Sequence, residues 1–306
     1  MRAIPKLFAA SLVMVLGVVA CATASARRDE AYPVWWSPEL GLDNLDRIDS
    51  LLAKTIPKNM QFIAMKHDGF KKIYKDTLDD KNKPWLRDEY YFEPNIVAQH
   101  LVDSCDSLFK WLETGFSAEG YDAFQLQRSL SGYCYTLRAL KTARPARTSH
   151  VRDFAFGDDA MDYIPVMVGT SWECRDINEK LEANRTGVSW SEYVYDASGN
   201  IPPYYKVRAE NDNSLIVEHL FPESQDKVSS VTHITIYGRG DFNGDGIDDL
   251  LMGWDWKDMI LSPHTSALYL VTRWKRDDVL RVVDVRGPGP WEGFKCVPRT
   301  KDFLPE

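Results

Sequence analysis

The sequence predicts an α+β protein, with a helical N-terminal domain over residues 41–143 and a mostly antiparallel β domain over residues 144–306. Before residue 143, apolar residues recur three or four positions apart, which is the spacing of one helix face. After residue 150, short runs of β-branched and aromatic residues alternate with turn formers, which is typical of antiparallel strands. Between two of these runs, Asp or Asn stands at residues 241, 243, 245 and 249.

Residues 1–26 are typical of an export signal. Arg2 and Lys6 precede an apolar run that is too short for a comfortable membrane span. The run ends in "VVAC", which resembles the bacterial lipobox, whose cysteine, here Cys21, becomes lipid-modified. "ASA" at residues 24–26 also fits an ordinary cleavage site, which would give a soluble periplasmic or secreted protein. Residues 27–40 are expected to form a tether.

The lipobox resemblance implies a location. Ala22 follows Cys21 where an aspartate would retain a lipoprotein at the inner membrane. We therefore expect a lipid anchor at the bacterial outer membrane, with the protein facing the periplasm or the cell surface.

Four helices are expected in the N-terminal domain. The first ends before Pro57, the second lies within residues 59–78, the third begins near Pro94 and the fourth follows residues 117–124. The apolar stripes of the first, third and fourth are Leu42, Leu45, Ile48 and Leu51; Val97, Leu101, Cys105, Leu108 and Leu112; and Phe124, Leu130, Cys134 and Leu137.

The four cysteines after Cys21 predict two disulfides, because an even number of cysteines is expected to pair in an oxidising compartment. Four cysteines allow three pairings. We favour Cys105–Cys134 with Cys174–Cys296, because the first two lie on the buried stripes of consecutive helices.

Strands are expected in the second half of the chain, separated by turn formers. A basic segment around Pro145, within residues 144–152, is expected to be a linker at the domain boundary. One short helix is expected within 158–164 or 175–184, and residues 210–214 are expected to turn a hairpin. The expected strands are 150–156, 190–196, 204–210, 214–221, 231–238 and 267–274.

Residues 241–249 carry the most specific pattern in the chain. Oxygen ligands at alternate positions of a tight loop can surround a hard cation, and Gly246 allows a sharp turn at position six. Calcium takes roughly six to eight such oxygens. The candidate ligands are the side chains of Asp241, Asn243, Asp245 and Asp249 and the backbone carbonyl of Ile247.

The residues around this loop distinguish two kinds of calcium site. Met252 stands where an EF-hand has its bidentate glutamate, and both flanks are strand-like. "GDFNGDGIDDLLMG" resembles the calcium loop of FG-GAP (VCBS-type) repeats, which joins two strands. The resemblance covers one copy and implies a structural calcium ion, a buried Phe242 and a solvent-facing Asp248.

Trp254 and Trp256 lie on one face of the strand that leaves this loop, because side chains two apart share a face. An exposed pair would form a platform for a ligand such as a sugar ring. A covered pair would belong to the core, which is the interpretation we prefer.

The sequence predicts a binding protein of the cell envelope. A net charge of −8 disfavours nucleic acid as a partner, and no nucleophile elbow, P-loop or HExxH motif is present. We expect a non-enzymatic lipoprotein, such as an inhibitor or immunity protein, that binds an envelope protein or a polysaccharide such as peptidoglycan. The alternative is a calcium-stabilised cell-wall hydrolase that uses clustered carboxylates, with Glu173, Glu179 and Glu192 as candidates.

Overall fold

The computed structural model describes residues 31–67, 96–118, 121–168, 177–193, 205–221, 224–258 and 264–286. These residues form helices and two antiparallel sheets, so the expected α+β class is confirmed. The expected signal with Cys21, the Cys174–Cys296 pairing and Glu173 lie outside the described residues. Among the helices in the described ranges, none is both long and apolar enough to cross a membrane.

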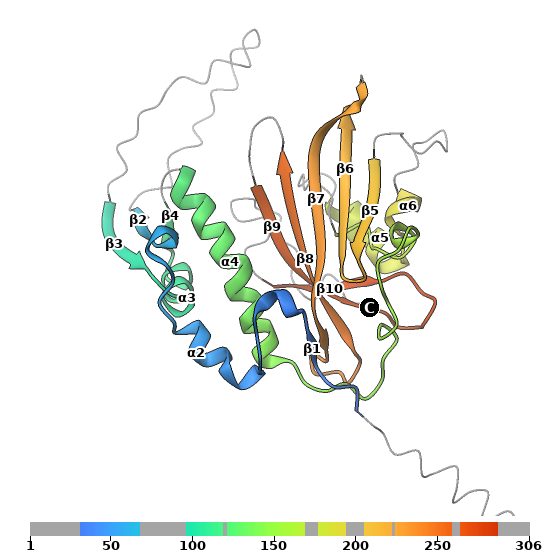
Figure 1. Cartoon of the computed structure of the whole chain (residues 1–306), viewed down its shortest axis with the longest axis horizontal. Helices are drawn as coiled ribbons and strands as arrows, with labels where there is room; N and C mark the ends of the chain where they lie inside the picture. Colours follow the sequence, from blue (N-terminus) through green and yellow to red (C-terminus); the bar gives the residue numbers. More distant parts are fainter. Residues whose placement is uncertain are drawn as a thin grey trace, which may run out of the picture.

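The large sheet is an antiparallel meander in the order β10-β9-β8-β7-β6-β5, and the short strand β1 pairs with β7 (Figure 1). Sequential strands are neighbours throughout, as expected when each pair is joined by a hairpin. The bounds are β1 Trp35–Trp36, β5 Tyr205–Asn211, β6 Ser214–Phe221, β7 Ser224–Gly240, β8 Asp249–Asp258, β9 His264–Thr272 and β10 Arg281–Val285.

Four of the six expected strands are confirmed. Strands β5, β6, β7 and β9 overlap the runs at 204–210, 214–221, 231–238 and 267–274, and β5 pairs with β6 across the expected hairpin. Residues 150–156 form no strand.

The strand expected at 190–196 is wrong over its described part, where a short helix, α6 (Trp190–Tyr193), lies instead. The Ser189 hydroxyl accepts a hydrogen bond from the Glu192 N–H at 3.3 Å, and the Glu192 carboxylate accepts one from the Ser189 N–H at 3.1 Å. This reciprocal capping box starts a helix in an otherwise strand-like sequence. Helix α5 (Ile177–Thr186) confirms the helix expected within 175–184.

The N-terminal region contains a small sheet in the order β3-β2-β4 beside its helices, so the expected helical domain is not confirmed. Most of the described part of the second expected helix is the strand β2, preceded by the short η3. The third helix begins at Cys105 instead of near Pro94, because residues 96–102 form another strand. The bounds are η1 Pro38–Leu40, η2 Leu45–Arg47, α2 Ile48–Leu52, η3 Lys58–Met60, β2 Phe62–His67, β3 Ile96–Val102, α3 Cys105–Glu113, β4 Ser117–Ala118 and α4 Tyr121–Thr142.

Alternating burial along β2 explains why this segment forms a strand of the small sheet. Phe62 and Ala64 are buried, whereas Ile63 between them is 40% exposed, so the period of the side chains is two. The Ser104 hydroxyl accepts from the Ser107 N–H, and this cap sets the beginning of α3 after the strand.

The disulfide Cys105–Cys134 is confirmed. It joins the first turn of α3 to the middle of α4, and both cysteines are buried. The long helix α4 confirms the fourth expected helix.

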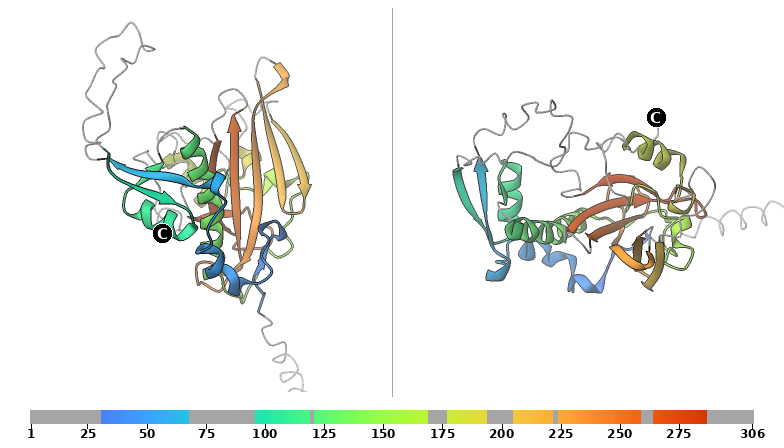
Figure 2. Two further views of the ribbon diagram at one scale, coloured as in Figure 1. Left: turned by 60° about the vertical axis from the view of Figure 1, so that its left-hand side comes forward. Right: turned by 90° about the horizontal axis from the view of Figure 1, so that it is seen from above.

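Two hydrophobic cores lie on the two faces of the large sheet. The first core lies between one face of the sheet and residues 151–168, α5 and α6. The second core lies on the other face, where α4 packs against the sheet, as Figure 2 shows, and α2 and α3 pack against α4. Leu137 and Leu140 of α4 and Leu268 and Leu270 of β9 belong to this second core, so the chain on both sides of residue 144 shares one core.

Candidate metal loop and ligand cavity

The loop of residues 241–248 joins β7 to β8. The two strands stay paired up to Gly240 and Asp249, which flank the loop. It is therefore a strand–loop–strand, as the sequence predicts. Phe242 is 5% exposed and lies in the second core, which confirms the burial expected for this aromatic residue.

The carboxylate of Asp241 is turned into the loop. Its two oxygens accept hydrogen bonds from the N–H groups of Gly244 at 2.6 Å and Gly246 at 2.9 Å. Both glycines have left-handed backbone conformations, with φ of 87° and 86°, which other residues adopt at a cost. Asp241 and the two glycines therefore set the curvature of the loop.

The side chains of the next two candidate ligands also accept hydrogen bonds from backbone N–H groups, in the solvent-exposed part of the loop. Asn243 accepts from the Asp245 N–H at 3.0 Å, and Asp245 accepts from the Ile247 N–H at 2.7 Å. Such side-chain caps are what Asn and Asp supply in turns. The side chains of Asn243 and Asp245 therefore each accept a hydrogen bond from the backbone N–H two residues later in the loop.

Asp249 is the buried member of the set, at 0% exposure. One carboxylate oxygen accepts from the Phe242 N–H at 3.3 Å, and the other has no hydrogen-bond partner. The pKa of Asp249 is raised to about 8: burial is the main cause and the charges of Asp245 and Asp241 add to it, whereas the Thr272 hydroxyl and the Phe242 N–H act in the opposite direction. A buried carboxylate without a compensating charge is costly, and a bound cation would remove that cost.

The residue types fit calcium, because all five candidate ligand atoms are oxygens, which hard cations prefer. Within the part of the chain that the structure describes, however, no three His, Cys, Asp or Glu side chains converge on one metal centre. The calcium assignment therefore stays a prediction.

Asp248, which was expected to face solvent, is 2% exposed. Its carboxylate accepts from the Ser149 hydroxyl at 2.7 Å. Burial raises the pKa of Asp248, whereas the Ser149 hydrogen bond and the charges of Arg239 and Arg152 lower it. Ser149 comes from the region expected to be a linker, and its contact explains why Asp248 is buried.

Residues 144–149, hereafter the clasp segment, run along the loop instead of forming the free linker that was expected. Arg144 and Asp241 exchange backbone hydrogen bonds of 3.0 and 2.8 Å. The N–H groups of Arg147 and Thr148 donate to the Gly246 carbonyl, and the Asp248 N–H donates to the Thr148 carbonyl at 2.8 Å. The clasp segment supplies the backbone partners that this part of the loop needs.

The two tryptophans of β8 belong to the core. Trp254 is 3% exposed in the first core, and Trp256 is partly buried against it. They do not form an open platform.

Of the three glutamates proposed for a hydrolase, two are described, and both make local contacts. Glu179 accepts from the Tyr193 hydroxyl at 3.2 Å, and Glu192 belongs to the capping box of α6. Neither lines the cavity described next.

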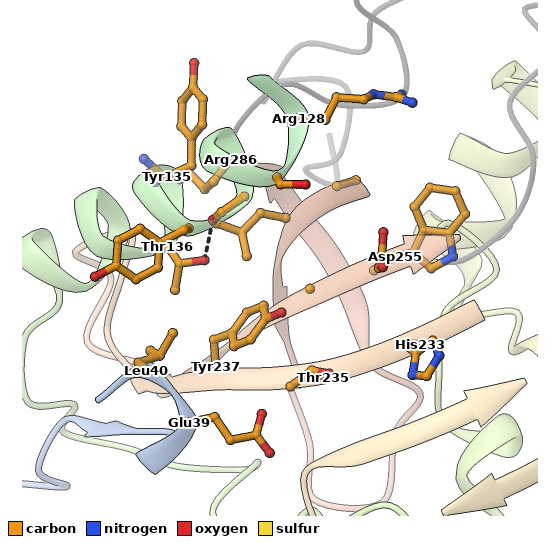
Figure 3. Close-up of a pocket in the computed structure, with 17 residues that line it drawn as sticks. Glu39, Leu40, Arg128, Tyr135, Thr136, His233, Thr235, Tyr237, Asp255 and Arg286 are labelled. Atoms are coloured by element: carbon orange, nitrogen blue, oxygen red, sulfur yellow. Dashed lines mark hydrogen bonds between the residues drawn. The ribbon is translucent and has the colours of Figure 1, made fainter. Parts of the chain in front are cut away.

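A cavity of about 580 Å³ lies between α4 and the large sheet (Figure 3). Its lining comes from η1, α4, β7, β8 and β9, together with Arg286 after β10. The polar part of this lining includes Glu39, Asp255, Arg128 and Tyr237.

Sequence reasoning missed this cavity because its residues come from elements far apart in the chain. Two local signals were present: Gly132 inside a helix and Gly253 inside a strand. An isolated glycine in either element often marks a close approach or an open space.

No family model matches the chain, and the searches of the curated proteins and of the solved structures likewise found no match. The FG-GAP resemblance therefore rests on the loop alone.

Proposed function

We propose that this chain is an exported, lipid-anchored protein of the bacterial envelope that binds an envelope protein or a polysaccharide such as peptidoglycan. Export and anchoring are supported by the "VVAC" sequence that ends at Cys21. The disulfide Cys105–Cys134 supports an oxidising compartment.

The proposal includes a structural calcium ion in loop 241–249. It would be held by the side chains of Asp241, Asn243, Asp245 and Asp249 and by the Ile247 carbonyl. The buried, unpartnered oxygen of Asp249 supports this assignment, because a divalent cation would neutralise a carboxylate that the fold otherwise leaves uncompensated.

The observation that carries the binding role is the cavity between α4 and the sheet. Its volume of about 580 Å³ falls within the roughly 300–1,000 Å³ that is typical of small-molecule sites. Side chains from five elements converge on it, and none of its lining residues belongs to the calcium loop or the clasp segment.

We prefer binding to the hydrolase alternative on the basis of the carboxylates. The hydrolase considered from the sequence would need its candidate glutamates to face each other across one cleft. Glu179 and Glu192 are instead used in local contacts of α5 and α6.

A pull-down from envelope extract tests the proposed function. The immobilised chain, loaded with calcium, is compared with a Gly132→Leu bait, which fills the cavity from the α4 side. We expect one stoichiometric protein or a glycan fraction on the first bait, and its loss on the second or in the presence of a chelator. Equal recovery on both baits, or no specific recovery, would contradict the proposal.

Cell fractionation tests the anchor separately. The wild-type protein is expected in the outer-membrane fraction, with a lipid-modified N-terminal peptide by mass spectrometry. Cys21→Ser is expected to release it to the soluble fraction. A soluble wild-type protein would refute the anchor.

A further inference from the structure

Charged groups of both signs line the cavity. Glu39 and Asp255 supply carboxylates, and Arg128 and Arg286 supply guanidinium groups, of which Arg286 also pairs with Asp284. Such a mixture gives no strong attraction to an ion of one sign. It does supply charge-assisted hydrogen bonds in both directions, with carboxylates as acceptors and guanidinium groups as donors.

Tyr237 provides an aromatic face at the floor of the cavity. It is the extra residue of a β-bulge, between the pairs Ile236–Met252 and Gly238–Leu251. Its ring stands edge-on over Gly253, since a Cβ added to that glycine would come within 2.2 Å of Cε2 but only within 3.0 Å of Cδ2 and 3.1 Å of Cζ. The faces of the ring are therefore not covered by this glycine, and the residue lines the cavity.

Figure 3 shows the Tyr237 ring and the Glu39 and Asp255 carboxylates in the same cavity, which all three residues line. Burial raises the pKa of the phenol, and the charges of Asp255 and Glu39 raise it further. A hydrogen bond with the Thr235 side chain lowers the pKa of the phenol and partly offsets this rise.

The opposite wall is a recessed, hydroxyl-bearing face of α4. No atom lies within 4 Å of a Cβ added to Gly132, so this position faces open space. Ser129 and Thr136 lie three residues before and four residues after it, on the same side of the helix. The missing side chain at Gly132 widens the cavity between these two hydroxyl groups.

We propose that this cavity binds a neutral oligosaccharide. Pyranose rings present apolar C–H faces, which stack on an aromatic ring, and hydroxyl groups, which hydrogen-bond to carboxylates and guanidinium groups. The cavity places Tyr237, Glu39, Asp255 and Arg128 around one space of about 580 Å³, which is enough for a short chain of such rings. This inference rests on the proposed binding function and names its ligand class.

Isothermal titration calorimetry of the full mature chain with calcium tests the inference. The probes are tetra-N-acetylchitotetraose, cellotetraose and maltotetraose, which share the ring type and differ in linkage and substituents. We expect saturable binding of at least one of them. Gly132→Leu and Tyr237→Leu should each weaken it by about tenfold or more.

Two controls separate loss of the site from loss of the fold. Thr142→Leu places a leucine at an exposed position at the end of the same helix, outside the cavity, and should change the affinity by less than about twofold. Gly132→Leu replaces glycine by a better helix former, so its melting temperature should not fall.

The outcomes distinguish this inference from the proposed function. If no tetrasaccharide binds but the pull-down still recovers an envelope protein that Gly132→Leu loses, the sugar class is refuted and the binding function stands. If Gly132→Leu binds the sugar as the wild type does, the cavity is not the sugar site. If neither sugar nor envelope partner binds, both proposals fail.

Discussion

Arg144 and Asp241 exchange two backbone hydrogen bonds. The Arg144 N–H donates to the Asp241 carbonyl at 3.0 Å, and the Asp241 N–H donates to the Arg144 carbonyl at 2.8 Å. This pair fastens the chain just beyond the end of α4 to the first residue of the β7–β8 loop. A segment that looks like a basic linker is therefore part of the loop structure.

Removing one of these hydrogen bonds should destabilise the fold. Arg144→Pro eliminates the N–H that donates to Asp241, at an expected cost of about 1–3 kcal/mol in the free energy of unfolding. Arg144→Ala keeps the backbone donor and should stay within about 0.5 kcal/mol of the wild type. Urea denaturation measures both, and equal stabilities for the two variants would show that the pair does not hold the loop.

Calcium should raise the thermal stability through the loop. Free calcium at about 100 times its Kd would add about 2.7 kcal/mol to the wild type. Asp245→Ala should lose most of this gain, and in chelator it should lose only the exposed cap to the Ile247 N–H, at a cost of about 0.5–1.5 kcal/mol. Asp158→Ala, another exposed aspartate, should keep the full calcium effect. Equal melting temperatures for wild type and Asp245→Ala in millimolar calcium would refute the metal site.

Gly253 should tolerate no side chain while Tyr237 is present. The Cβ of Gly253→Ala would overlap the Tyr237 ring, at an expected cost of about 1–3 kcal/mol. Combining it with Tyr237→Ala removes the overlap, so the two costs should not add. A double-mutant cycle by denaturant unfolding measures the coupling, and strict additivity would contradict the contact.

The Tyr237 phenol should ionise above its ordinary range. Its pKa is raised from 10.0 by burial, with Asp255 and Glu39 adding to the effect. Because the folded-state pKa exceeds the unfolded one, the stabilisation is fully present below pH 10 and is lost as pH rises through the folded pKa. Tyr237→Phe should lose less stability than the wild type above pH 10. Burial also raises the pKa of Tyr133, so absorbance titration of both proteins should show one late-ionising phenol fewer in Tyr237→Phe, and identical curves would reject the assignment.

The disulfide should contribute to stability by restricting the unfolded chain. Cys105 and Cys134 are 29 residues apart, and a closure of this length is expected to contribute about 2–4 kcal/mol. Cys105→Ala/Cys134→Ala should therefore unfold at lower urea concentration under non-reducing conditions. A midpoint unchanged from the wild type would show that the link adds nothing.

The sequence was most informative where structure is determined by neighbouring residues. The β5–β6 hairpin and the turn after Gly240 have local turn signals, and both form. The Ser189–Glu192 capping box was equally local but was overlooked among strand-forming residues.

The errors arise where local signals are ambiguous or absent. Ile63 and Leu101 face each other across β2 and β3, although their surroundings fit a helical stripe equally well over so few residues. The cavity depends on α4 packing beside β7 and β8, and no spacing along the chain encodes that contact. The burial of Asp248 likewise depends on Ser149, almost a hundred residues earlier.

The two walls of the cavity have a common end. Helix α4 leads into Arg144, and β7 leads into Asp241, so the elements that border the sugar-sized space are tied together at the loop. An ion bound in the loop and a molecule bound in the cavity would both act on the distance between α4 and β7. If the ion changes the affinity for the molecule by some factor, then by thermodynamic linkage the molecule must change the affinity for the ion by the same factor.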